Sequence, residues 1–193
     1  MVSAPASARS YERRAPPPLD AAALDRLALR YVERFATTRH KLTQYLARKI
    51  RERGWEGPPA DPVALADRLA ALGYIDDRGF GEARAAAMAR RGLGARRVQG
   101  ALHAAGVTGE DAESLAPAIA ARAADAALRF ARRRRIGPFG DSPPDRALRE
   151  RQVAAMLRAG HSIEITRQIM AIAPGDDDAI HAMAGEGAAF GVA

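Results

Sequence analysis

The 193-residue sequence has no cysteine, few aromatic residues and almost no lysine. Without cysteine, disulfide bonds and thiolate metal sites are excluded. Aromatic residues make up only 5% of the chain and alanine is abundant, so each buried side chain removes little apolar area from water. We therefore expect several thin helical bundles in place of one deep core.

Three sequence patterns are also missing. No segment alternates apolar and polar residues as a half-buried strand does, so the chain is expected to be all-α. No apolar run approaches the length that spans a bilayer, which predicts no membrane association. The N-terminal segment lacks the apolar stretch of a signal peptide. We therefore expect a cytoplasmic protein.

The basic residues are almost wholly arginine, since Lys41 and Lys49 are the only lysines among 30 basic residues. The formal net charge is +7. Guanidinium groups match the geometry of phosphate and carboxylate, which favours a polyanion or an acidic protein surface as partner. Codon usage in a GC-rich genome also enriches arginine together with alanine, glycine and proline, and it is the competing explanation.

Start and stop signals divide the chain into short helices. Asp20 and the Asp61-Pro62 pair are typical helix starts. Glycines such as Gly54 and Gly160 are typical helix ends. In the alanine-rich segment after Thr108, Pro117 is expected to end one helix and begin another.

Three short segments share a pattern in which a branched apolar residue is followed four positions later by leucine. They are Leu42–Leu46, Val98–Leu102 and Val153–Leu157, and their first residues lie 56 and 55 positions apart. This regular spacing predicts three tandem three-helix units that stack into an elongated, curved molecule. Coincidence is the alternative, because the pattern is common in helices. The expected divisions are a disordered basic arm at 1–19, units at 20–73, 74–120 and 121–173, and a disordered acidic tail at 174–193.

The stretch from Gly73 to Val107 is the best-defined part of the sequence. Asp76 and Asp77 precede a helix, and adjacent residues at a helix start point in different directions. We therefore interpret them as a cap and a charge at the positive end of the helix dipole, in preference to a catalytic acid pair. Gly92 and Gly94 interrupt the helix between two arginine pairs.

These residues resemble the central signature of the RecX family of regulatory proteins. The matching positions are Gly73, Tyr74, Asp76, Asp77, Phe80, Gly92, Gly94, Leu102 and Gly106. The resemblance covers about residues 24–173. Gly79, Gly81 and Ala101 depart from the family pattern, and the two glycines weaken the first turn of their helix by roughly 1 kcal/mol each relative to alanine.

The resemblance implies a monomeric regulator that binds the RecA recombinase and its filament on single-stranded DNA. Such a protein restrains the ATPase, co-protease and strand-exchange activities of RecA, and so modulates recombination and the SOS response. It needs no cofactor and catalyses no reaction of its own. Weak nonspecific DNA binding is expected beside the protein contact.

Three clusters of basic residues are the candidate contacts for RecA or DNA phosphate. The first holds Arg48, Lys49, Arg51 and Arg53, the second Arg90, Arg91, Arg96 and Arg97, and the third Arg132, Arg133, Arg134 and Arg135. Each is expected near a helix C-terminus, where the helix dipole alone favours cations. The second cluster is preferred, because its glycines let a partner approach the backbone closely.

Two other classes of function fit the residues less well. An enzyme is not indicated, since the four histidines are scattered, His161 and Glu164 lack a further metal ligand, and no phosphate-binding loop is present. A helix-turn-helix transcription regulator would use the segment 95–105 as its recognition helix. That helix offers only Gln99 and His103 to read bases, and specific readout normally needs several such side chains.

Overall fold

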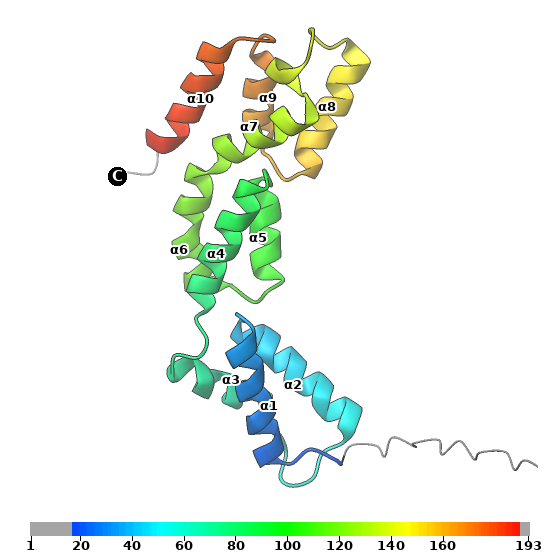
Figure 1. Ribbon diagram of the computed structural model, residues 1–193, viewed down its shortest axis with the longest axis vertical. Helices are drawn as coiled ribbons and strands as arrows, with labels where there is room; N and C mark the ends of the chain where they lie inside the picture. Colours follow the sequence, from blue (N-terminus) through cyan, green and yellow to red (C-terminus); the bar gives the residue numbers. More distant parts are fainter. Residues whose placement is uncertain (1–16, 190–193) are drawn as a thin grey trace, which may run out of the picture.

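The computed structural model describes residues 17–189, and this range is built from helices (Figure 1). In chain order they are α1 (Ala21–Arg34), α2 (Arg39–Arg53), α3 (Pro62–Ala71), α4 (Asp77–Arg90), α5 (Ala95–His103), α6 (Gly109–Ala121), α7 (Ala123–Arg134), the 3₁₀ turn η1 (Gly137–Phe139), α8 (Arg146–Arg158), α9 (Ile163–Ala171) and α10 (Asp177–Ala189). No strand forms within residues 17–189, where Leu19 and Trp55 make an isolated bridge. The all-helical prediction is confirmed.

The helices pack around three separate cores that follow one another along the chain. The first lies among α1, α2 and α3 and includes the fully buried Leu42 and Leu46. The second lies among α4, α5 and α6 and includes Val98 and Leu102. The third lies among α7, α8, α9 and α10 and includes Met156. The segments that share the leucine pattern thus each supply residues to a different core.

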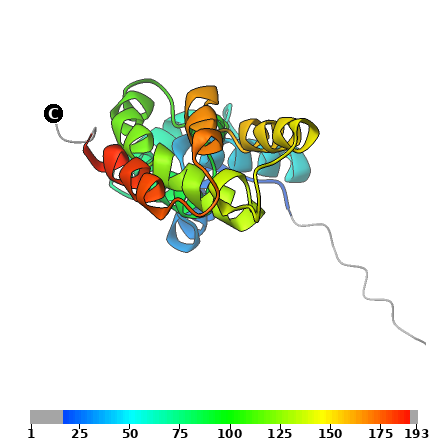
Figure 2. The same ribbon diagram turned by 90° about the horizontal axis from the view of Figure 1, so that it is seen from above.

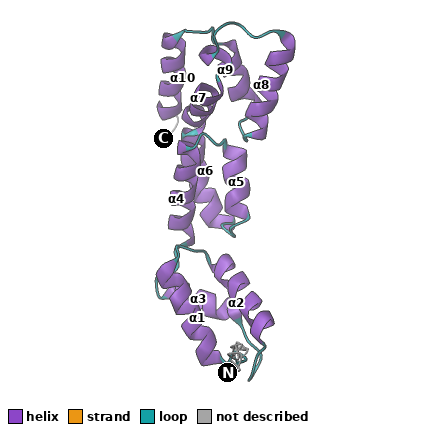
Figure 3. Cartoon of the chain, turned by 45° about the vertical axis from the view of Figure 1, so that its right-hand side comes forward, coloured by secondary structure: helices purple, strands orange, loops and turns teal. Residues whose placement is uncertain are grey.

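The three groups of helices are stacked along one axis, so the molecule is elongated and gently curved (Figure 1). Figure 3 shows α1–α3 at one end, α4–α6 in the middle and α7–α10 at the other end. Viewed along the long axis, the groups overlap one another (Figure 2). No helix in residues 17–189 combines the length and the apolarity needed to cross a membrane.

The helix boundaries follow the signals in the sequence. The carboxylates of Asp20, Asp61 and Asp76 accept hydrogen bonds from backbone amides in the first turns of α1, α3 and α4. Asp145 and Ser162 do the same for α8 and α9. Such caps satisfy amides that have no partner within the helix, and each typically stabilises by about 1 kcal/mol.

The glycine ends also share one geometry. Gly73, Gly92, Gly106 and Gly160 all have positive φ, between 70° and 93°. In each case the residue after the glycine donates its amide to a carbonyl five positions earlier, as Tyr74 does to Leu69 at 3.0 Å. This is the Schellman ending, whose left-handed residue is favourable only for glycine.

Pro117 does not divide the alanine-rich segment as expected. Helix α6 continues through Pro117 to Ala121, and the break falls at Arg122. Pro117 is exposed, whereas Leu115 and Ile119 on either side of it are buried in the second core. Their packing holds the helix together despite the hydrogen bond that proline cannot make.

The expected disorder of both ends needs correction. Residues 177–189 form α10, where Asp176 accepts the amide of Ala179 at 3.0 Å and the buried Ile180 and Met183 join the third core. The acidic residues that suggested a disordered tail therefore begin a helix. At the other end Leu19 is fully buried in the first core. Residues 1–16 and 190–193, which complete the expected arm and tail, lie outside the described residues.

Candidate binding surface

The junction between the first and second groups of helices is held by Arg39, the first residue of α2. Its backbone amide and its Nε donate to the two carboxylate oxygens of Asp77 at 2.9 and 2.8 Å. Asp77 is buried, with 7% of its side chain exposed. Asp67 and Asp111 lie 3.8 and 3.9 Å from the same guanidinium group. The hydrogen bond and charge of Asp77 raise the pKa of Arg39, so this arginine stays charged.

The same junction places the start of α2 on the end of α5. The hydroxyl of Thr38, which caps α2, donates to the carbonyl of Ala105. Gly106 lies so close to His40 that a Cβ added at Gly106 would stand 2.1 Å from the His40 Cβ. Gly106 is therefore needed for two reasons, a left-handed backbone and close contact between helix groups. We call this contact the first joint.

Lys41 adds a cation–π contact to the first joint. Its ammonium group lies 4.4 Å from the centre of the Phe80 ring. Burial, together with the nearby charge of Arg84, lowers the pKa of Lys41. Phe80 of the signature thus contacts the first group of helices as well as the second core.

A second joint connects the middle group to the last one, and it repeats this arrangement. The amide of Gly94, which precedes α5, donates to the carbonyl of Ala159 at the end of α8 at 2.9 Å. The amide of Arg96 donates to the Gly160 carbonyl at 3.2 Å. A Cβ added at Gly94 would lie 2.2 Å from the Gly160 carbonyl carbon. Only glycine fits at this position without moving the two groups apart.

In both joints the N-terminus of one helix meets the C-terminus of the corresponding helix in the next group. Helix α2 meets α5, and α5 meets α8. The positive end of each helix dipole therefore faces a negative end, and backbone groups that a helix leaves unpaired find partners across the joint. Of the signature residues, Asp77, Phe80 and Gly106 shape the first joint and Gly94 shapes the second.

The second joint also buries His161, which follows Gly160. Its side chain is 1% exposed and its ring centre lies 5.4 Å from that of Phe130. Neither ring nitrogen has a hydrogen-bond partner among the described residues. Burial lowers the pKa of His161, and the backbone of Gly92 only partly opposes this shift. His161 is thus a neutral core residue of the joint, a role that the sequence did not reveal.

The second and third arginine clusters meet on one surface. The guanidinium group of Arg133 donates to the carbonyl of Arg91, which brings the end of α7 to the end of α4. Arg90 lines a hollow of about 460 Å³ together with Arg129, Arg132 and Arg133. We call Arg90, Arg91, Arg129, Arg132 and Arg133 the arginine face. Arg129 was not among the expected contacts, and its place on α7 one turn before Arg132 and Arg133 explains its presence here.

The arginine face carries an excess of positive charge. All five of its arginines are exposed, and within residues 17–189 none of them makes a salt bridge. Asp125 and His181 line the same hollow, and Asp125 is the one carboxylate in its lining. Exposed guanidinium groups that make no salt bridge are available to phosphate or to acidic side chains.

Arg96 and Arg97 are placed differently from the expectation. They stand in the first turn of α5, at the positive end of its dipole, where cations are disfavoured. Arg97 donates from Nη1 to the carbonyl of Arg158 at 3.2 Å, at the negative end of α8. Its charge is therefore compensated across the second joint, and only Arg90 and Arg91 of this cluster belong to the arginine face.

The first cluster lies in the other end group and is largely occupied. Arg48 and Lys49 both pair with Glu52, at 3.6 and 2.7 Å. Arg53 donates to the carbonyl of Pro17. Arg51 makes no salt bridge within residues 17–189. The three clusters therefore do not form one continuous site.

The remaining two arginines of the third cluster lie at the end of α7. Arg135 adopts a left-handed conformation with φ of 52° and lies 3.4 Å from the carboxylate of Asp141. The guanidinium group of Arg134 lies 5.9 Å from the centre of the Phe130 ring.

Signature residues also line a second hollow of about 600 Å³ between the first and second groups. Gly73, Tyr74, Asp76 and Phe80 are joined there by Arg84 and Arg91. Tyr74 is 52% exposed, so this aromatic ring is not part of a core. The hollow adjoins the arginine face through Arg91.

The two adjacent aspartates at the start of α4 make different contacts. Asp76 caps α4 by accepting the amide of Gly79 at 2.8 Å, whereas Asp77 is bound to Arg39. The two carboxylates therefore serve different contacts and do not act as an acid pair. No cluster of three or more potential metal ligands occurs among the described residues.

Comparison with known proteins gives consistent matches. The chain is 31% identical over 156 residues to the "Regulatory protein RecX" of Myxococcus xanthus, which covers 76% of this chain and 83% of that protein. It is 29% identical over 151 residues to the protein of the same name from Agrobacterium fabrum, with coverage of 75% and 80%. The crystal structure of RecX from Lactobacillus salivarius matches the fold with a TM-score of 0.58 and 19% identity, over 77% of this chain and 93% of that one. No family model matches the sequence.

Proposed function

The chain belongs to the family of RecX regulatory proteins, and from this premise we propose that it binds the RecA recombinase and restrains it without catalysing a reaction of its own. In this proposal the protein lies on the RecA filament formed on single-stranded DNA. It inhibits ATP hydrolysis, co-protease activity and strand exchange, and so modulates recombination and the SOS response in the cytoplasm. These activities are the ones that the resemblance of the signature residues to the RecX family implies.

The single observation that supports a binding role best is the arginine face, whose members make no salt bridge within residues 17–189. Helices α4 and α7 present five exposed guanidinium groups where the middle and last groups of an elongated molecule meet. A nucleoprotein filament offers both acidic side chains and phosphate, the two groups that guanidinium binds in bidentate fashion. An elongated body suits a partner that is itself a long polymer.

We further propose that the chain consists of three tandem three-helix units at 20–73, 74–120 and 121–173, to which α10 adds a last helix. The repeated joints support this division, because α2 and α5 make the same kind of contact with the next group. In each joint a hydrogen bond to a backbone carbonyl at the end of one helix, Ala105 or Ala159, links one unit to the next. Such a body would act as a monomer that spans several partner surfaces.

A helix-turn-helix regulator is the alternative, and the second joint argues against it. In that class the N-terminal residues of the recognition helix contact base edges in the major groove. Here the N-terminus of α5 is covered by the end of α8, through Gly94 and Ala159. Weak nonspecific contact between the arginines and DNA phosphate remains part of the proposal.

The proposed function is tested by adding the protein, in amounts below that of RecA, to RecA filaments on single-stranded DNA. ATP hydrolysis and strand exchange should both fall. The same preparation is then titrated with random and selected DNA duplexes. Undiminished RecA activity together with tight binding to one duplex sequence would contradict the proposal and support the transcription regulator.

A further inference from the structure

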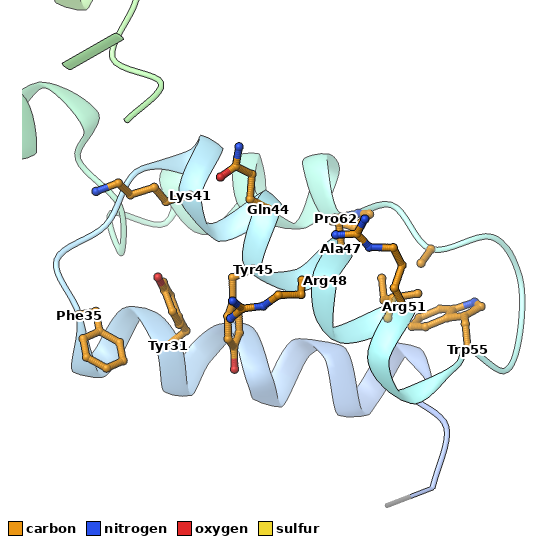
Figure 4. Close-up of a pocket in the computed structure, with 12 residues that line it drawn as sticks. Tyr31, Phe35, Lys41, Gln44, Tyr45, Ala47, Arg48, Arg51, Trp55 and Pro62 are labelled. Atoms are coloured by element: carbon orange, nitrogen blue, oxygen red, sulfur yellow. The ribbon is translucent and has the colours of Figure 1, made fainter. Parts of the chain in front are cut away.

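A groove of about 1150 Å³ lies between α1, α2 and the loop that leads into α3 (Figure 4). The chain contains one Trp, four Tyr and five Phe residues, and four of these aromatic residues line the groove. They are Tyr31, Phe35, Tyr45 and Trp55. A chain that is poor in aromatic residues thus places many of them at one surface site.

The aromatic rings are arranged in series and are only partly covered. Tyr31 and Tyr45 are stacked with ring centres 4.3 Å apart and an angle of 25° between their planes. The Phe35 ring follows at 5.3 Å from Tyr31, and this residue is 49% exposed. Tyr31 and Tyr45 are half-buried against the first core, and the ring surface that stays uncovered, together with the exposed Phe35, offers flat apolar surfaces to a ligand.

The rim of the groove is basic. Lys41, Arg48 and Arg51 line it, and its lining contains no carboxylate. Glu52 lies beside the groove and pairs with Arg48 at 3.6 Å. Arg51 makes no salt bridge within residues 17–189 and is exposed. The groove therefore combines ring faces with uncompensated positive charge.

Single-stranded nucleic acid is the ligand that matches both features. Its unpaired bases stack on aromatic rings, and its phosphates bind guanidinium groups. A duplex keeps its base faces inside the stack, and an acidic peptide supplies carboxylates without a regular series of flat rings. We propose that this groove binds a single strand, with bases on Tyr31, Phe35 and Tyr45 and phosphates on Arg48 and Arg51. The proposal gives a site and a form of nucleic acid to the weak DNA binding proposed above.

Trp55 provides a direct signal for this binding, because it is the only tryptophan in the chain and it lines the groove. Its indole N–H donates to the Pro58 carbonyl at 2.7 Å, which fixes the ring. The full chain, without RecA, is titrated with oligothymidylate while Trp55 fluorescence is followed. A strand of abasic deoxyribose phosphates and a duplex, both of equal length, serve as comparisons. We expect quenching by oligothymidylate and at least about tenfold weaker binding of both comparison ligands.

Matched variants locate the site. Phe35→Leu and Tyr45→Leu keep apolar bulk but remove a stacking face, so each should weaken oligothymidylate binding about five- to tenfold. Tyr74→Leu is the control, since Tyr74 is 52% exposed and lies outside the groove. Arg51→Ala should weaken binding and reduce its salt dependence, whereas Arg149→Ala on α8 should change neither. Circular dichroism checks that each variant is folded. Because Phe35 is exposed, Phe35→Leu should disturb the fold least.

Three results would overturn the proposal. They are equal affinity for the abasic strand and oligothymidylate, wild-type binding by Phe35→Leu, and tighter binding of a polyglutamate peptide than of the oligonucleotide. Since no RecA is present, each of these outcomes is independent of whether the protein regulates RecA.

Discussion

Asp77 accepts two hydrogen bonds from Arg39, and this pair joins the start of α4 to the start of α2. The contact joins two of the three groups of helices, and Arg39 is followed by His40, whose side chain lies against Gly106. An aspartate that looks like a simple helix-start residue in the sequence is therefore the main polar connection of the first joint. The orientation of the first group depends on it.

Replacing Asp77 by alanine should loosen the first joint. The change removes two hydrogen bonds to a charged group and leaves the Arg39 amide without its partner. Because Arg39 is 48% exposed and therefore screened by solvent, we expect a loss of about 1–3 kcal/mol in the free energy of unfolding. Urea denaturation measures this loss.

Asp67→Ala is the matched control for Asp77→Ala. Asp67 lies 3.8 Å from the same guanidinium group but is 57% exposed. An exposed ion pair of this kind is worth at most about 1 kcal/mol, so the control should change stability less. Equal losses for the two variants would mean that burial of Asp77 is unimportant.

The second joint predicts opposite effects for two glycines near the same helix. In Gly94→Ala the new Cβ meets the backbone of Gly160, so stability should fall by about 1–3 kcal/mol or the joint should open. Gly100 lies inside α5 with no atom within 4 Å of an added Cβ. Gly100→Ala should therefore stabilise the protein by about 0.5–1 kcal/mol. Urea denaturation measures the change in unfolding free energy for both variants, and small-angle scattering detects a change in the length of the molecule. Destabilisation by both variants would contradict this account.

Buried His161 predicts that stability falls as the pH is lowered. Burial lowers its pKa in the folded chain, so below about pH 6.5 the unfolded chain binds a proton that the folded chain does not. The stability that neutral His161 contributes is fully present above that pH. It decreases by up to about 1.4 kcal/mol per pH unit as the pH falls toward the folded pKa.

The variant His161→Leu tests whether His161 causes this pH dependence of stability, because leucine is apolar and does not titrate. The difference in unfolding free energy between wild type and variant should shift in favour of the variant from pH 7.5 to pH 5.5, pH values chosen to lie on either side of about 6.5. A difference that is constant with pH would show that His161 does not titrate on unfolding.

Local signals in the sequence predicted most of the helices and their ends. An N-cap such as Asp61 and a left-handed glycine such as Gly73 act on neighbouring residues, so their effects can be recognised without knowing the fold. The acidic composition after residue 173 misled the prediction, because Ile180 and Met183 carry the helical spacing that joins α10 to the third core.

The contacts between groups could not be found in this way. Arg39 and Asp77 are 38 positions apart, and Arg133 and Arg91 are 42 apart. Nothing in the neighbourhood of either partner indicates the other. The arginine face arises only when α4 and α7 meet, so the prediction placed its members in separate clusters and omitted Arg129.

The central claim, that the arginine face restrains RecA, is tested most directly by RecA ATP hydrolysis on single-stranded DNA. Wild type is compared with the triple variant Arg90→Ala, Arg91→Ala and Arg132→Ala, and with a control that replaces Arg149, Arg151 and Arg167 by alanine. Both variants remove three exposed positive charges, and the control changes α8 and α9 only. If the arginine face makes the contact, half-inhibition should require at least about tenfold more of the first variant, with the control close to wild type. Equal inhibition by all three proteins would contradict the claim.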